Sequence, residues 1–290
     1  MNRLIGLVRN PVLGKEIRLR FRSIKSILGI FFYLFVLTAL ALACLFLVST
    51  TSNIGADQSR TLFLVLTIGQ MVLIAFMAPG LTAGVISGER ERQTLNILLT
   101  TRQSSSAIVL SKMLSSLAFL ALMVVSSLPL YAIAFLYGGI SPQMVLQTFG
   151  VFLLTMFTFG SIGVLFSTLV RKTIVSMVTT YGIVLFLMVG TAVVAAFFNI
   201  FLSQTYTGHI QSFHPFMYMF YSANPIFILV SLFENGFAQS MQMGANYFQP
   251  QWLFFVELYL VISALSVWVS IRRLRPQYRS RLSAEDLGHE

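Results

Sequence analysis

Hydrophobic residues occur along the chain in six long runs, separated by shorter polar segments. A helix needs about 20 apolar residues to cross a hydrocarbon core about 30 Å thick, because it rises about 1.5 Å per residue. Each run meets that length, so the pattern predicts an all-α integral membrane protein with a six-helix transmembrane domain at residues 27–271. The approximate spans are Ile27–Ser49, Thr61–Ile86, Ala107–Tyr137, Val145–Val170, Ile174–Phe198 and Trp252–Ile271.

The polar segment after the second run is long enough to form a helix of its own. We predict this helix at about residues 87–104, with Glu89, Arg90, Glu91 and Arg92 at its start. Acidic residues in the first turn are favoured by the helix macrodipole. The segment is interpreted as a docking surface, and a solvated charged loop is the alternative.

Residues 1–26 are predicted to form the cytoplasmic N-terminus and, at Asn10–Lys25, an amphipathic helix that lies in the membrane interface before the first span. Asn10 suits the N-cap position and a proline follows it, as is common at the first helical position. Apolar residues recur every three or four positions, while basic residues such as Lys15, Arg18 and Arg22 occupy the other face. This helix is either an elbow packed against the bundle or a general anchor on anionic lipid.

The segment between the fifth and sixth runs, at about residues 199–251, is rich in aromatic residues and contains no Lys or Arg. Pro225 in this segment is followed by the apolar run Ile226–Phe233, which is too short to cross a bilayer. Backbone at membrane depth must be helical or shielded by protein. We therefore predict an outer re-entrant helical hairpin with Asn224 and Pro225 near its turn. An ordinary interfacial loop is the alternative.

Charge assigns the ends of the spans to the two sides of the membrane. The chain has 290 residues, of which only 10% are charged, against about 25% in a soluble domain. With both termini in the cytoplasm, every one of the 19 Lys and Arg residues except Arg60 is cytoplasmic. Cytoplasmic loops are enriched in these residues. We therefore predict a multi-pass cell-membrane protein with a cytoplasmic tail at 272–290. The net charge of +10 reflects this placement and not a nucleic-acid partner.

Glu257 lies a little more than one turn inside the predicted sixth span. An acid within a span is a functional hypothesis by default, so we consider it, with Asn224 and Pro225, as a candidate outer gate. A carboxyl held by nearby polar groups is the alternative. No metal site is predicted, because the one cysteine is isolated and the outer-loop histidines, His209 and His214, have no suitable partners.

Several short motifs together resemble the permease subunits of ABC exporters, the type-2 family. In that family an acidic pair precedes a Thr-Leu-x-x-Leu-Leu helix, and a small residue with Lys opens the third span. The matching residues here are Glu89, Glu91, Thr94-Leu95, Leu98-Leu99, Ser111-Lys112 and, in the elbow, Asn10-Pro11 and Lys15-Glu16. The chain departs from the family pattern at Gln93, where Gly is usual, and at Arg102, where Pro is common.

The resemblance implies a half-transporter whose helix after the second span couples to a separate ABC ATPase subunit. The residues it implicates in coupling are Glu89, Arg90, Glu91, Arg92, Thr94, Leu95, Leu98 and Leu99. A second permease subunit, identical or different, would complete the pathway. The sequence has no G-x-x-x-x-G-K-[ST] motif. ATP and Mg²⁺ are therefore expected on the partner, with no cofactor and no enzymatic activity on this chain.

Two other classes of function stay open. A secondary transporter should carry paired ionisable residues or broken helices near the membrane midplane, and the predicted spans are poor in charge. A non-transporting partner or sensor that associates with an active permease is the second. In the leading interpretation the second and fifth spans line the pathway, which suits an amphiphilic or apolar cargo.

Overall fold

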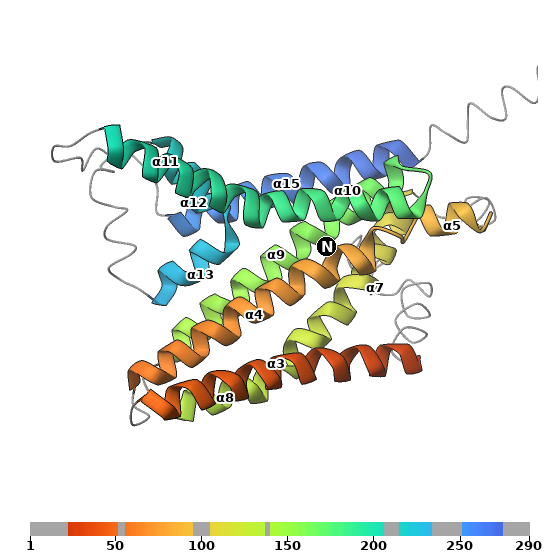
Figure 1. Cartoon of the computed structure of the whole chain (residues 1–290). Helices are drawn as coiled ribbons and strands as arrows, with labels where there is room; N and C mark the ends of the chain where they lie inside the picture. Colours follow the sequence, from red (N-terminus) through yellow and green to blue (C-terminus); the bar gives the residue numbers. More distant parts are fainter. Residues whose placement is uncertain are drawn as a thin grey trace, which may run out of the picture.

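The computed structural model describes residues 23–51, 56–94, 105–136, 140–205, 215–233 and 251–274 (Figure 1). Every regular element in these residues is a helix, and they contain no strand. The elbow residues Lys15, Glu16, Arg18 and Arg22 lie outside the described residues, as do Leu95, Leu98 and Leu99. Their predicted roles therefore stay predictions.

Six helical segments are long and apolar enough to cross a membrane, which confirms the six predicted spans. Three of them, the second, the third and the fifth, consist of more than one helix, and the second ends in the single turn α5 (Ser87–Glu91). The spans are formed by α3 (Ile24–Thr51), α4 (Ala56–Thr82), α7 (Ser105–Ser126) with α8 (Leu128–Leu136), α9 (Pro142–Leu169), α10 (Thr173–Leu185) with the π-helix η1 (Phe186–Gly190) and α11 (Thr191–Thr205), and α15 (Gln251–Leu274).

The fourth span, α9, is the centre of the bundle and packs against both α4 and α15. Phe152 and Phe159 on this helix are fully buried. A side chain at Gly160 would collide with Leu117 of α7, and one at Gly163 would collide with Thr82 of α4. These glycines therefore allow close helix approach inside one chain, as small residues do in membrane bundles.

The third span breaks at Ser127, between α7 and α8. Pro129 follows two residues later, and a proline in a helix has no N–H to donate and clashes with the preceding turn. The Ser127 hydroxyl lies 2.8 Å from Oε1 of the buried Gln70 on α4, and the Tyr131 hydroxyl lies 3.0 Å from the same atom. The break is thus held by polar contacts to the second span.

Two short helices, α12 (Pro215–Ala223) and α13 (Pro225–Phe233), meet at Asn224 in the segment predicted as a hairpin. Each has nine residues, too few to cross a bilayer. From this junction α12 packs along α11 and α15, while α13 turns toward α4 and α9 (Figure 1). Two helices joined near Asn224 are therefore present, and their depth in the membrane stays a prediction.

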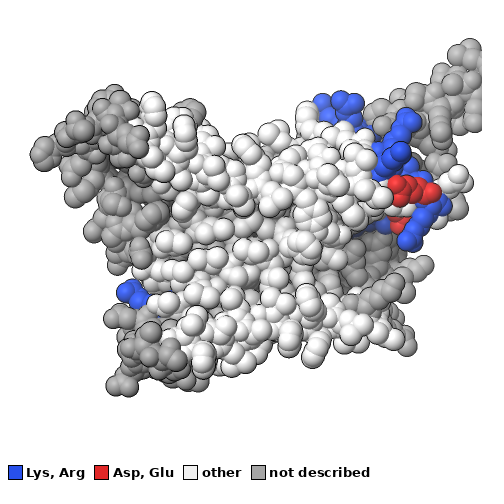
Figure 2. All heavy atoms as spheres, viewed as in Figure 1, with Lys and Arg blue, Asp and Glu red and all other residues white. Residues whose placement is uncertain are grey.

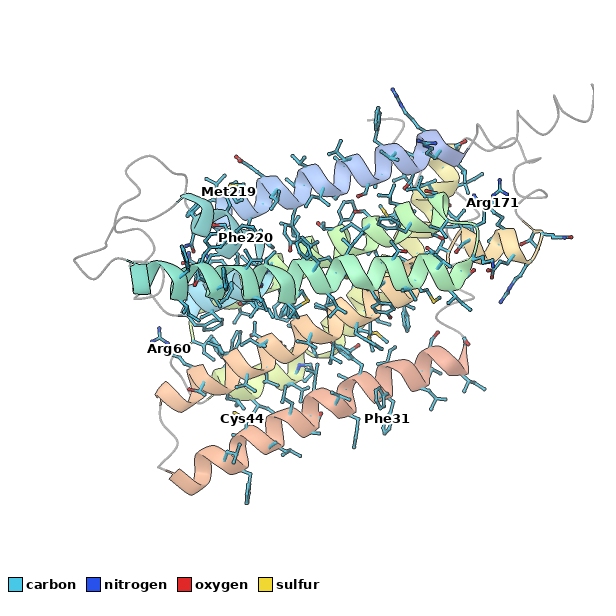
Figure 3. The ribbon with its side chains drawn as sticks, turned by 45° about the horizontal axis from the view of Figure 1, so that its top comes forward. Phe31, Cys44, Arg60, Arg171, Met219 and Phe220 are labelled. Carbon is cyan, nitrogen blue, oxygen red and sulfur yellow. The ribbon has the colours of Figure 1, made fainter. Side chains whose placement is uncertain are left out.

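Charged side chains gather at one end of the bundle (Figure 2). Arg171 lies at this end and Arg60 at the opposite end (Figure 3). The surface between the two ends is apolar, with large exposed side chains such as Phe31 on α3, Phe76 on α4 and Phe186 on η1. Such a surface suits a hydrocarbon solvent and not water.

Candidate functional site

The charged end is organised around α5 (Ser87–Glu91), a single helical turn that follows α4 after the turn at residues 83–86. The first residues of a helix have N–H groups without intrahelical partners. The neighbouring span supplies the missing acceptor, because Oγ of Ser167 on α9 accepts from the N–H groups of Ile86, at 2.8 Å, and Ser87, at 3.0 Å. A side chain 80 positions away in sequence thus caps α5.

Two further hydroxyls fix the same turn from other helices. Ser176 of α10 donates to the carbonyl of Ala83 at 2.7 Å. Ser116 of α7 lies 3.2 Å from the carbonyl of Leu81. With Ser167, three serines from three different spans therefore hold the connection between α4 and α5.

Glu89 forms the first of three side-chain links from α5 to the spans. Its Oε1 lies 3.1 Å from Nζ of Lys112 on α7, and its Oε2 accepts from the Thr94 hydroxyl at 2.8 Å. The Lys112 side chain is only 10% exposed and that of Glu89 is 33% exposed. This ion pair is therefore partly shielded from water and ties α5 to the third span.

Arg90 binds the C-terminal end of the fourth span, and Glu91 binds the N-terminal end of the fifth. The Arg90 guanidinium donates to the carbonyl of Thr168 at 3.2 Å and lies 3.5 Å from that of Val170, at the C-terminus of α9. Glu91 accepts from the N–H and the hydroxyl of Thr173, each at 2.7 Å, at the N-terminus of α10. The cation meets the negative end of a helix dipole and the anion a positive end, so both contacts are electrostatically favourable.

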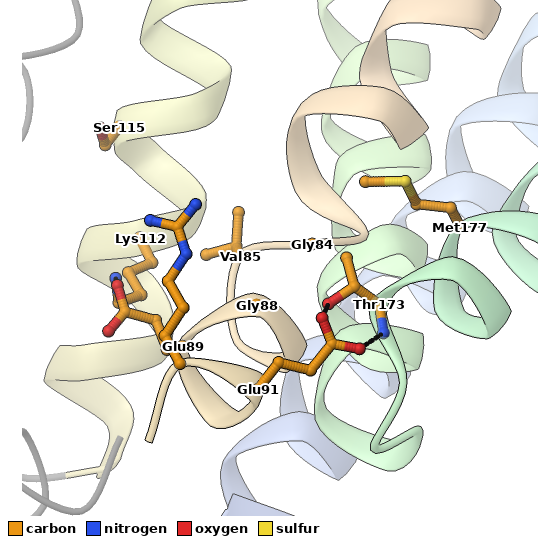
Figure 4. Close-up of a pocket in the computed structure, with 10 residues that line it drawn as sticks. Gly84, Val85, Gly88, Glu89, Glu91, Lys112, Ser115, Thr173 and Met177 are labelled. Carbon is orange, nitrogen blue, oxygen red and sulfur yellow. Dashed lines mark hydrogen bonds and ion pairs between the residues drawn. The ribbon is translucent and has the colours of Figure 1, made fainter. Parts of the chain in front are cut away.

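A cavity of about 720 Å³ opens between α5, α7 and α10 (Figure 4). Gly84 lets the α4–α5 turn approach α10, because a Cβ there would lie 3.2 Å from atoms of both Thr173 and Met177. The cavity combines charged and apolar walls. Its lining residues are Gly84, Val85, Gly88, Glu89, Glu91, Arg92, Lys112, Ser115, Thr173 and Met177.

The structure differs from the prediction of one helix over residues 87–104. Helix α5 ends at Glu91, and Gln93 has a φ of 59°, in the left-handed region. The chain then folds back, so that the N–H of Thr94 donates to the carbonyl of Glu89 at 3.0 Å. Gln93 is the position where the type-2 pattern has Gly, the residue that adopts this conformation without steric cost. Residues 95–104 lie outside the described residues.

A comparison with protein-family models identifies the family of the chain. A family model described as an ABC-2 family transporter protein matches residues 11–273. The chain belongs to this family. A search among curated proteins finds no significant match. Membership of the ABC-2 family makes the chain a permease subunit of an ABC transporter and a multi-pass membrane protein. It also implies association with an ABC ATPase subunit.

At the other end of the permease, Asn224 joins the short helices to the fifth span. The side chain is fully buried, and its Nδ2 donates to the carbonyl of Met188 at 2.6 Å and to the Thr191 hydroxyl at 2.9 Å. Its Oδ1 accepts from the N–H of Ile226 at 2.9 Å. Asn224 is thus the N-cap of α13, and Pro225 occupies the first helical position. Its amide also satisfies a carbonyl of η1, and π-helices are common at functional sites.

The structure does not bring Glu257 together with Asn224. Glu257 is exposed on the surface of α15, whereas Tyr259, two residues later, is fully buried and its hydroxyl lies 3.2 Å from the carbonyl of Ala223. Residues two apart on a helix point in nearly opposite directions. Tyr259, which the sequence analysis did not single out, therefore links the sixth span to the junction.

Proposed function

We propose that this permease is the membrane-spanning half of an ATP-driven exporter and that it receives the work of ATP hydrolysis through α5. The observation that supports this is the set of links from three consecutive residues. Glu89, Arg90 and Glu91 bind the third span, the end of the fourth and the start of the fifth, respectively. A force applied to α5 would therefore act on three spans at once.

The partner would supply the nucleotide chemistry. The sequence contains no P-loop motif, so we assign ATP and Mg²⁺ to the ATPase subunit and no catalytic role to this chain. The cavity beside α5, with Arg92 on its wall, is the proposed socket for the ATPase. Thr94, Leu95, Leu98 and Leu99 would extend the contact. This arrangement requires the α5 end, both chain termini and the elbow to lie on the cytoplasmic side of the cell membrane.

A second permease subunit would close the pathway along α4 and the fifth span. Both present exposed apolar side chains, including Val72 and Phe76 on α4 and Phe186 and Val189 on η1. An apolar surface shared by these two spans suits a subunit interface and a pathway for amphiphilic cargo. Rigid movement of the spans would switch the pathway between inward-facing and outward-facing states.

We assign the outer gate to the junction of α12 and α13. Asn224 connects this junction to η1 in the fifth span, and Tyr259 connects it to the sixth. Pro225 fixes the direction in which α13 leaves, because its ring restricts the backbone. Glu257 would contribute from the exposed surface of α15.

Charge reversal tests the coupling role directly. Glu89→Lys and Glu91→Lys would be co-expressed with the cognate ATPase, and co-purification and ATP hydrolysis of the reconstituted complex would be measured. Arg60→Glu, at the opposite end, is the control with an equally large charge change. We expect both Glu variants to lose ATPase binding or stimulation and the control to keep both. Wild-type coupling in both Glu variants would refute the assignment.

A transport assay in proteoliposomes distinguishes the alternatives. The proposed exporter moves cargo only when ATP reaches the ATPase side. A secondary transporter would move cargo with an ion gradient and no ATP. A non-transporting partner or sensor would bind the ATPase but move no cargo under either condition.

A further inference from the structure

A second cavity, of about 370 Å³, lies at the end of the bundle opposite α5, between α9, α13 and α15. Its floor is formed by the buried side chains of Ile228 and Phe255, and its rim by exposed residues. None of the lining residues is charged. They are Gln147, Gly150, Val151, Leu154, Ile228, Leu232, Trp252, Phe255 and Val256.

Polarity changes along this groove in one direction. The polar residues of the lining are Gln147, in the second turn of α9, and Trp252, in the first turn of α15. The residues deeper in the bundle, such as Leu154 and Val256, are all apolar. From Gln147 to Leu154 the groove follows α9 for seven residues, about 10 Å. The groove therefore has a polar entrance near the membrane interface and an apolar interior.

The location of the groove limits its occupant. Two of its walls are candidate membrane spans, and the exposed apolar residues Leu146 and Leu153 lie next to its lining residues on α9. A polar solute would lose its hydration there without gaining charged partners, which costs several kcal/mol per group. An amphiphile from the bilayer pays no such dehydration cost, because its chain is already surrounded by hydrocarbon.

The groove is polar at Gln147 and Trp252 and apolar at Leu154 and Val256. That order matches the groups along a phospholipid that enters from the membrane interface. We propose that the groove binds one acyl chain of a membrane phospholipid, with the polar headgroup region at Gln147 and Trp252. The indole N–H and the amide would donate to ester or phosphate oxygens.

Gly150 provides a way to fill the groove. A Cβ at this position would meet no atom within 4 Å, so the larger side chain of Gly150→Leu can enter the space without a clash at its base. Gly182 on α10 has the same open surroundings but lies outside the groove. Gly182→Leu is therefore the matched control, with the same added side chain in a membrane-exposed helix.

The experiment uses the full chain in proteoliposomes of phosphatidylcholine that carry a trace of phosphatidylcholine with a photoactivatable acyl chain. Crosslinked peptides are mapped by mass spectrometry. We expect labelling to concentrate at Val151, Leu154 and Val256, and to fall about tenfold in Gly150→Leu, which corresponds to about 1.4 kcal/mol of binding free energy. Labelling in Gly182→Leu should match the wild type. Thermal unfolding of each variant confirms that it is folded.

Two results would overturn the proposal. One is labelling of the groove that is no stronger than labelling of Phe31 and Phe35 on the outer face of α3, or that is unchanged by Gly150→Leu, since either would mean ordinary bulk lipid. The other is efficient chain-to-chain disulfide formation by Leu154→Cys in the membrane, because that would identify the groove as an interface between two copies. Neither readout depends on transport, so the lipid site can fail while the exporter function stands.

Discussion

The ion pair between Glu89 and Lys112 allows a quantitative test of how α5 is attached to the third span. We consider Glu89→Gln, Lys112→Met and the double variant, which remove one charge, the other, or both while keeping side-chain size. The two side chains differ in exposure, 33% for Glu89 and 10% for Lys112. The cost of each single change therefore depends on which charge remains behind.

Removing the carboxylate takes the Glu89 counter-ion from the more buried of the two charges. Breaking a fully buried pair costs about 3–5 kcal/mol, and the partial exposure of Glu89 reduces this to about 2–3 kcal/mol. Removing Lys112 leaves a carboxylate that water reaches and that still accepts from Thr94, so we expect about 1 kcal/mol. The double variant should cost about as much as Lys112→Met alone. The coupling between the two sites then equals the cost of Glu89→Gln, about 2–3 kcal/mol.

The assay is equilibrium unfolding of the purified chain in mixed micelles by titration with SDS. Arg60→Gln serves as a charge-removal control on an exposed side chain and should stay within about 0.5 kcal/mol of wild type. The reasoning is refuted if Lys112→Met destabilises more than Glu89→Gln. It is also refuted if the coupling energy falls below about 0.5 kcal/mol, the range in which independent sites are additive.

Two further predictions use the same assay at the two ends of the bundle. Gln93→Gly should stabilise the chain by about 0.5–1 kcal/mol. The left-handed backbone costs a non-glycine residue about 1–2 kcal/mol, and the greater loss of conformational entropy when glycine folds offsets part of that gain. Gln93→Ala should bring no gain. Asn224→Asp should destabilise the chain by about 1–3 kcal/mol. A carboxyl group can still cap α13, but with at most one proton it cannot donate to both the carbonyl of Met188 and the hydroxyl of Thr191, as the amide does. A loss no larger than that of Thr191→Val would contradict this role.

The spans and the break at Asn224 were predictable because both depend on short-range properties of the sequence. A run of apolar residues must be helical in a bilayer, whatever it packs against. Asn-Pro is a local signal as well, since Asn supplies an N-cap acceptor and Pro fits the first helical position. The structure confirms the six spans and places Asn224 and Pro225 at these two positions.

The links of α5 were not predictable, because they depend on tertiary packing: Glu89 and Lys112 are 23 positions apart, and the partners of Arg90 and Glu91 are about 80 positions away. Nothing in the local sequence distinguishes Ser167 or Thr173 from other hydroxyls in the spans. The end of α5 was missed for a related reason, since Gln93 is a good helix former and the usual glycine signal is absent. The π-helix lies in an apolar run and does not alter the hydrophobic pattern. The exposure of Glu257 depends on which face of α15 meets the bundle.

The contacts of Arg90 and Glu91 restrict how the proposed transport cycle can proceed. These adjacent residues bind the last turn of α9 and the first turn of α10, so the fourth and fifth spans cannot separate at this end without breaking one of the two contacts. A force on α5 would therefore move these ends together. The relative motion that opens a pathway would then have to occur further along the fifth span. That is where the helix changes to η1, and where Asn224 connects it to the short helices.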